Sequence, residues 1–139
     1  MPPATLRLEL KRDLQAPAIA RALTGGRCDR LEISPAQCQN LVLLVSEIVS
    51  NAVLHSQAPA DTPIVLTTTV TEETIRVTVT DTGKGFVPVA RKPGSGHGGY
   101  GLYLLDKVAH RWGVDRVGGT RVWFELTRTA ADVAESAIR

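Results

Sequence analysis

Two runs of β-branched residues, joined by a short polar turn, constrain the fold of this chain more than any other feature. Residues 64–70 and 75–79 are rich in valine, isoleucine and threonine, and Glu72 and Glu73 lie between them. Such runs are typical of strands, and a connection this short allows only antiparallel pairing. The centre of the chain therefore predicts a β-hairpin.

The segments on either side of this hairpin predict further helices and strands. Leucines alternate with charged residues over residues 6–10, and this period of two indicates a first strand. Residues 16–23 are alanine-rich, contain proline near their start and are followed by two glycines, as expected for a short helix. Helical spacing over residues 102–110 precedes a second hairpin, with strands at residues 112–117 and 121–126.

A long helix is predicted to begin after Ser34, because residues 34–37 have the pattern of a capping box with proline at the first helical position. Its apolar residues recur at intervals of three and four and mark the core face: Leu41, Leu44, Val45, Ile48 and Ala52. The same helix carries Glu47, Asn51 and His55 at steps of four, which places them in one stripe. A polar stripe is also typical of a solvated helix face, so by itself it indicates no function.

This order of elements predicts a two-layer α/β sandwich, in which helices pack on one face of a mainly antiparallel mixed sheet. A length of 139 residues suits a single domain over residues 1–139, with a core at about residues 4–127 and a tail at residues 128–139. Residues 81–101 lack an apolar period and hold many of the glycines, so we expect a long loop there. A loop of this length in a compact domain is typical of a lid or a binding loop.

Composition and charge argue against several broad classes of protein. The net charge of +2 is spread along the chain, which does not indicate a nucleic-acid surface. The N-terminus lacks the apolar stretch of a signal peptide, and we expect no segment with the ~20 apolar residues of a membrane span. Cys28 and Cys38 fit neither a CxxC pair nor a zinc site, so they are expected to be free thiols. A cytoplasmic protein without membrane or direct nucleic-acid contacts is predicted.

Three short motifs follow one another along the chain. Glu47 and Asn51 form ExxxN in the long helix, Asp-Thr-Gly-Lys-Gly begins at Asp81 after a predicted strand, and Gly-Gly-Tyr-Gly-Leu at residues 98–102 precedes a helix. Each motif alone is common as a helix face, a turn or a flexible linker. Glycines before a helix also let backbone N–H groups approach a phosphate. The chain has neither the P-loop pattern nor the glycine pattern of a Rossmann site, so those nucleotide folds fit less well.

Taken together and in this order, the three motifs resemble the N, G1 and G2 boxes of the GHKL ATPases, which share the Bergerat fold. The resemblance covers nearly the whole chain and implies ATP and Mg²⁺ as cofactors, with residues 81–101 as a glycine-rich ATP lid. A free-standing domain of this length, without a transducer domain or a histidine-bearing helical segment, resembles the anti-sigma-factor serine kinases of the RsbW and SpoIIAB type. Its helix and last hairpin are similar to those of actinobacterial members.

The resemblance implies a role for each matching residue. Glu47 is expected to be the general base and Asn51 the Mg²⁺ ligand. Asp81 matches the carboxylate that accepts a hydrogen bond from the adenine amino group, and Thr120 matches a threonine that helps to hold adenine. The other expected ATP-binding residues are glycines of the two boxes and the start of the following helix: Gly83, Gly85, Gly99, Gly101 and Leu102.

The same resemblance implies a serine/threonine protein kinase that phosphorylates a STAS-domain anti-anti-sigma factor and sequesters a sigma factor, with a possible homodimer. The first strand and helix, including Arg21, resemble the region through which relatives dimerise and meet their partners. Tyr100 departs from the pattern, because the family often has arginine at this point of the closing motif. The alternative is therefore a catalytically weak or inactive ATP-binding module that regulates a partner without phosphoryl transfer.

Overall fold

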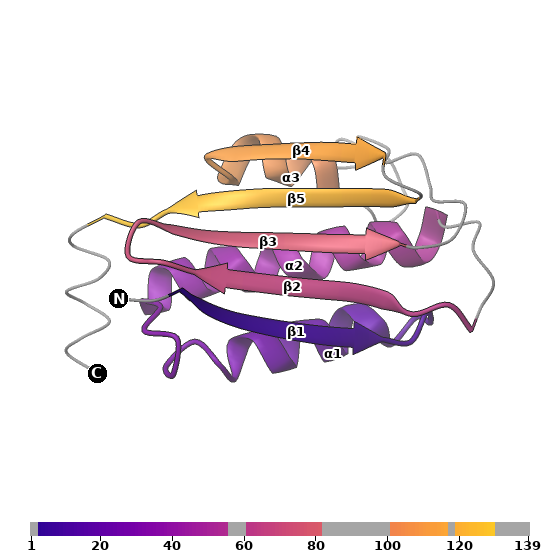
Figure 1. Ribbon diagram of the computed structural model, residues 1–139, viewed down its shortest axis with the longest axis horizontal. Helices are drawn as coiled ribbons and strands as arrows, with labels where there is room; N and C mark the ends of the chain where they lie inside the picture. Colours follow the sequence, from indigo (N-terminus) through magenta and orange to yellow (C-terminus); the bar gives the residue numbers. More distant parts are fainter. Residues whose placement is uncertain (1–2, 56–60, 82–100, 117–118, 130–139) are drawn as a thin grey trace.

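The computed structural model describes residues 3–55, 61–81, 101–116 and 119–129, and it shows one sheet with helices packed on one of its faces (Figure 1). The strands are β1 (Ala4–Leu10), β2 (Ile64–Val70), β3 (Thr74–Asp81), β4 (Arg111–Arg116) and β5 (Thr120–Thr127). The helices are α1 (Ala16–Gly25), α2 (Pro35–His55) and α3 (Gly101–Val108). The strand order is β1-β2-β3-β5-β4, and every pairing is antiparallel. The predicted α/β sandwich is confirmed.

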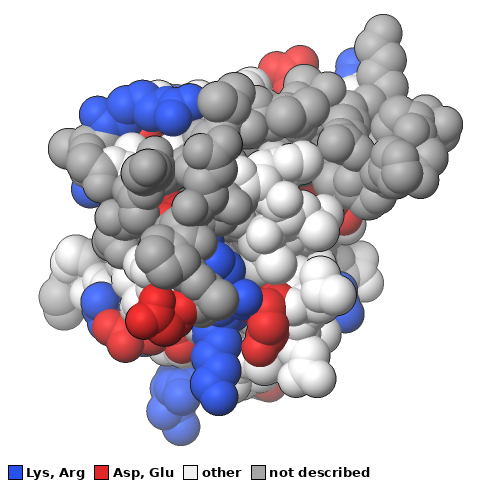
Figure 2. Space-filling view, turned by 90° about the vertical axis from the view of Figure 1, so that its right-hand side faces the viewer, with Lys and Arg blue, Asp and Glu red and all other residues white. Residues whose placement is uncertain are grey.

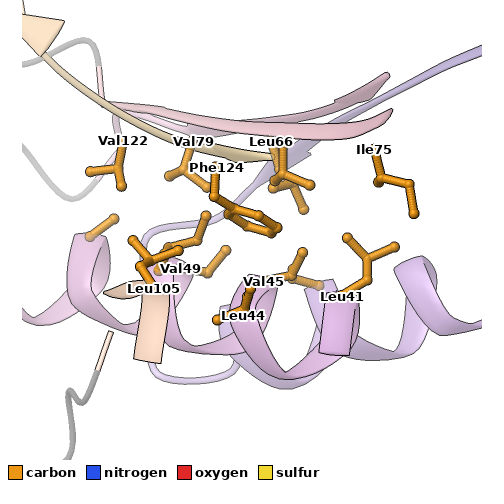
Figure 3. Close-up of a cluster of buried hydrophobic side chains, with 14 of the residues drawn as sticks. Leu41, Leu44, Val45, Val49, Leu66, Ile75, Val79, Leu105, Val122 and Phe124 are labelled. Atoms are coloured by element: carbon orange, nitrogen blue, oxygen red, sulfur yellow. The ribbon is translucent and has the colours of Figure 1, made fainter. Parts of the chain in front are cut away.

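The core lies between the sheet and the helices, because the strands bury every second side chain on the helix-facing side. α2 contributes the residues predicted from its period, which are all buried: Leu41, Leu44, Val45, Ile48 and Ala52. Figure 3 shows this buried layer, to which Phe124 of β5 and Leu105 of α3 also belong. Burying a large apolar side chain contributes ~1.5–3 kcal/mol. The apolar face of α2 therefore fixes where the polar residues on its neighbouring stripe lie.

The start of α2 is capped by Ser34, whose Oγ accepts a hydrogen bond from the backbone N–H of Gln37 at 3.2 Å. The other half of the predicted capping box is replaced, because Nε2 of Gln37 donates to the backbone oxygen of Thr127 at 2.9 Å. This bond ties the start of α2 to the end of β5. The helix then runs along the sheet, so its last turns lie at the opposite end of the sheet (Figure 1).

α2 is the exception to the expectation that no segment has the length and hydropathy of a membrane span. Its most apolar window has a mean hydropathy of 1.2. Eight of its residues are buried within the domain, where they pack against the sheet and the other helices. This burial is what the central helix of a two-layer sandwich requires.

The last helix and hairpin differ from the predicted boundaries by one or two residues. α3 ends at Val108 and not at His110. The reason is that His110 is bonded to β5: its N–H donates to the oxygen of Glu125, and its Nδ1 accepts from the N–H of Thr127, both at 3.0 Å. The expected tail from residue 130 onward lies outside the described residues.

The expectation of two free thiols is wrong, because Cys28 and Cys38 form a disulfide. The segment between α1 and α2 turns back on itself, with the N–H of Ile33 bonded to the oxygen of Cys28 at 2.9 Å. This turn brings the two Cα atoms to 6.1 Å, within the range that a disulfide spans. Disulfides persist mainly in oxidising compartments, so this bond does not favour the expected cytoplasmic location.

The outer face of the sheet contains a glycine that leaves room for a tryptophan. Gly113 of β4 lies opposite Trp123 of β5, and a Cβ on this glycine would lie 2.7 Å from Nε1 of Trp123. Arg76 and Arg111 hold the ring in place, with guanidinium carbons 4.2 Å and 5.8 Å from its centroid.

Gly113→Ala is therefore expected to lower the free energy of unfolding by ~1–3 kcal/mol, because the methyl group displaces the indole. Urea unfolding measures this change. Gly25→Ala is the matched control. Gly25 is the last residue of α1, and its new Cβ would lie at an ordinary 3.6 Å from the side chain of Val42 in α2. Equal stability of the two variants would show that Trp123 adjusts to the methyl group without cost.

Candidate functional site

One end of the sheet carries a row of four buried side chains that face the helices. The register places Leu10 opposite Ile64, Ile64 opposite Asp81, and Asp81 opposite Thr120. All four residues are buried. The last turns of α2 lie at the same end of the sheet (Figure 1). The fold thus makes Asp81 and Thr120, which are far apart in the sequence, direct cross-strand neighbours.

The carboxylate of Asp81 forms a two-point ion pair with Arg12, a residue just beyond the end of β1. Nη1 of Arg12 donates to Oδ2 at 2.8 Å, and Nη2 donates to Oδ1 at 3.0 Å. The side chains of Arg12 and Asp81 are 5% and 0% exposed. Nε of Arg12 also donates to the backbone oxygen of Thr62 at 3.2 Å. Sequence reasoning missed Arg12, because no local pattern links it to a carboxylate 69 positions away.

Thr120 is held at the start of β5 by its backbone and by a neighbouring arginine. Its side chain is fully buried, and Nη1 of Arg116 donates to its Oγ1 at 3.4 Å. Gly119, immediately before it, has a φ of 153°, which residues with a side chain rarely adopt. Glycine is therefore needed where the chain enters β5. A hydroxyl and a carboxylate side by side offer a ligand both a donor and an acceptor.

Asn51 carries an unsatisfied polar atom close to the end of α2. Its side chain is 1% exposed, and within the described residues its Oδ1 has no hydrogen-bond partner. Leaving a buried acceptor unpaired costs ~1–3 kcal/mol, so a ligand that bonds to this oxygen would remove that cost. A neutral carbonyl oxygen is a suitable ligand for a hard cation such as Mg²⁺. The residue predicted to hold the metal therefore fits that group.

The described part of the chain offers Mg²⁺ no complete protein cage, since it has no cluster of three or more histidine, cysteine, aspartate or glutamate side chains. This is compatible with the usual mode of Mg²⁺ binding, in which one or two protein ligands act together with phosphate oxygens and water. A metal at Asn51 would therefore depend on a phosphate-bearing ligand.

Glu47 lies one helical turn before Asn51 and is half-buried. The helix places both residues in one stripe, with His55 at its end. Of the expected glycine boxes, Gly83, Gly85, Gly99 and Tyr100 lie outside the described residues. Gly101 is the first residue of α3 and Leu102 the second, so the helix begins where the motif predicts.

Comparisons with known proteins show the family and the fold of this chain. The family model of the histidine kinase-like ATPase domain matches residues 10–126 of this chain. A solved structure of the RsbU and RsbW domains of Rv1364c from Mycobacterium tuberculosis superposes with a TM-score of 0.70 at 20% identity, over 94% of this chain and 34% of that chain. The chain thus spans about a third of that structure's length, and the likeness shows a shared fold. No curated protein matches the chain.

Proposed function

This chain belongs to the histidine kinase-like ATPase family, and we propose that it binds ATP at the end of the sheet that carries Asp81 and Thr120. The observation that supports this most is the buried carboxylate of Asp81 beside the buried hydroxyl of Thr120. In this proposal Asp81 accepts a hydrogen bond from the adenine amino group, and Thr120 holds the same ring. The phosphates then extend towards α2 and the start of α3, where a helix N-terminus favours negative charge.

Asn51 would hold Mg²⁺ through its Oδ1, the atom that has no partner within the described residues. Bound Mg²⁺ neutralises charge on the phosphate oxygens. The buried residues around Asn51 fix its position on α2, so its Oδ1 would hold the metal at a defined place. Gly83, Gly85, Gly99, Gly101 and Leu102 complete the proposed ATP site.

We further propose that the protein is a serine/threonine kinase of the anti-sigma-factor type. Glu47 would accept the proton of a serine hydroxyl while the hydroxyl oxygen bonds to the γ-phosphorus, and ADP leaves with the electrons of the broken bond. The position of Glu47, one turn from Asn51, supports this role. The RsbW domain in the solved structure named above supports the choice of kinase class.

The proposed protein substrate is a STAS-domain anti-anti-sigma factor, and the proposed second partner is a sigma factor that the protein sequesters. α1 supports a partner surface, because Ile19 and Leu23 are exposed there at 44% and 40%. Arg21 lies between them in the sequence, and its Nη1 donates to Oγ of Ser46 in α2 at 3.0 Å. The same surface suits a homodimer.

A second candidate function is an ATP-binding module that regulates its partner without phosphoryl transfer. Tyr100 favours it, since tyrosine cannot supply the charge of the arginine that the family often has there. Incubation with labelled Mg-ATP and STAS proteins separates the two functions. Transfer of label to a serine supports the kinase, and sigma-factor binding without any transfer supports the module.

Asp81→Asn tests the proposed ATP site. We expect it to raise the Kd for Mg-ATP about 10- to 100-fold, because a hydrogen bond to a charged group contributes ~1.5–3 kcal/mol. Isothermal titration calorimetry on folded protein measures the change. Asp115→Asn, an exposed aspartate of β4, is the matched control. An unchanged affinity of Asp81→Asn for Mg-ATP would mean that adenine does not bind at Asp81, which would contradict the proposal.

A further inference from the structure

The carboxylate of Asp81 is closed to any incoming ligand in the arrangement seen here. Its side chain has no exposed surface, and each of its oxygens already accepts a hydrogen bond from a different nitrogen of Arg12. A new donor can reach the carboxylate only if a group that now covers it moves. Arg12 contacts both oxygens, so its guanidinium is one group that a base amino group would have to displace.

A groove beside Arg12 offers its guanidinium a second position. It lies in the segment between β1 and α1, outside any helix or strand. Beside it is an open groove of about 540 Å³, whose charged lining residues other than Arg12 are the acidic Glu9, Asp13 and Asp61 and the basic Lys11. Figure 2 views this end of the molecule and shows acidic and basic side chains side by side in its lower half. A guanidinium that leaves Asp81 can therefore enter solvent close to three carboxylates.

The energetics favour exchange over simple addition of the ligand. A buried arginine whose only charged partner has been taken by another donor is costly, typically by several kcal/mol. In the groove the same charge is hydrated and near opposite charges, where its cost is small. Exchange requires two positions for the Arg12 guanidinium, the observed one on Asp81 and a second one in the groove, and a ligand on Asp81 would select the second.

We propose that Arg12 competes with the nucleotide base for the carboxylate of Asp81, so that this chain regulates its own affinity for adenine nucleotides. The inference rests on the proposed adenine contact of Asp81. In the closed state Arg12 occupies the carboxylate, and only the fraction of molecules with Arg12 in the groove binds the base. The apparent affinity for ATP is lowered by that fraction.

Competition at one carboxylate has a signature that depends on the base. Adenine carries an exocyclic amino group that can donate to Asp81, whereas hypoxanthine carries at the same position a carbonyl oxygen, which only accepts hydrogen bonds. Removal of Arg12 should therefore improve the binding of ATP and leave the binding of inosine triphosphate unchanged. An arginine that merely supports the fold would affect both nucleotides alike when removed.

The experiment measures the Kd values of Mg-ATP and Mg-inosine triphosphate by calorimetry for the full chain and for Arg12→Gln. We expect Arg12→Gln to bind ATP at least about fivefold more tightly, the lower end of usual coupling between two ligands, with no change for inosine triphosphate. Arg30→Gln is the matched control: Arg30 is exposed in the segment between α1 and α2, and it lines a groove with the start of β1, at the end of the sheet opposite to Asp81. It should bind both nucleotides like the unmodified chain.

The possible outcomes are distinct. If Arg12→Gln binds ATP as tightly as the unmodified chain or more weakly, the competition is overturned and the proposed function stands. An equal gain in affinity for both nucleotides also overturns the competition and leaves the proposed function standing. If neither protein binds ATP, the proposed function and the competition fail together. ATP binding by Arg12→Gln alone supports the competition most strongly. Should Arg12→Gln not fold, Arg12→Lys serves in its place, because lysine makes a single contact and should give a smaller gain confined to ATP.

Discussion

Glu47→Ala is expected to lower phosphoryl transfer to a STAS partner by ~10²- to 10⁴-fold, the usual effect of losing a general base. Its affinity for Mg-ATP should stay nearly unchanged, because the proposed contact of Glu47 is with the attacking hydroxyl and not with the nucleotide. Single-turnover transfer of labelled phosphate measures the first quantity, and calorimetry measures the second.

Glu73→Ala is the matched control for this variant, since Glu73 is exposed in the turn between β2 and β3, at the opposite end of the sheet. It should transfer phosphate at the unmodified rate. If Glu47→Ala transferred phosphate as fast as Glu73→Ala, Glu47 would not be the base. If its ATP affinity fell in step with its rate, Glu47 would act in binding.

Asn51→Ala is expected to differ in kind, because it should weaken nucleotide binding itself. Changes in the residues that merely orient a metal ligand already cost ~10–100-fold in metal affinity, so loss of the proposed ligand should cost at least as much. The advantage of Mg²⁺ over EDTA in ATP binding should disappear. Calorimetry with and without Mg²⁺ measures this difference.

The stability of Asn51→Ala in the absence of nucleotide gives a second readout. The Oδ1 of Asn51 is buried without a partner in the described part of the chain, so its removal relieves an unsatisfied group and offsets part of the cavity that alanine leaves. We expect little loss in the free energy of unfolding. Asn40→Ala, at an exposed position of the same helix, should change neither stability nor binding. A large loss of stability with unchanged Mg²⁺ dependence would assign Asn51 a structural role.

Much of the fold was predictable from local patterns in the sequence. The β-branched runs predicted the hairpin of β2 and β3, and the three- and four-residue spacing in α2 identified its core face. Asp81 was predicted as a site residue from its motif, and Thr120 from the resemblance to the family. Their direct pairing follows from the register of β3 and β5.

The contacts that sequence reasoning missed all join residues through the folded topology. Arg12 reaches Asp81, Gln37 bonds to the backbone of Thr127, and Cys28 meets Cys38 across a turn. No periodicity encodes these meetings, because they depend on where elements pack and not on which face an element buries. The glycine boxes of the expected lid stay predictions, since residues 82–100 lie outside the described part of the chain.

The direction of the strands has a consequence for how the domain can be combined with others. β1 begins and β5 ends at one end of the sheet, where Ala4 pairs with Val70 and Thr74 with Thr127, whereas Asp81 lies at the other end of the sheet, as the last residue of β3 (Figure 1). The described chain therefore enters β1 and leaves β5 at the end remote from the proposed nucleotide site. A signalling domain joined before β1 or after β5 would have its point of attachment there, so the attachment itself would leave the proposed site uncovered.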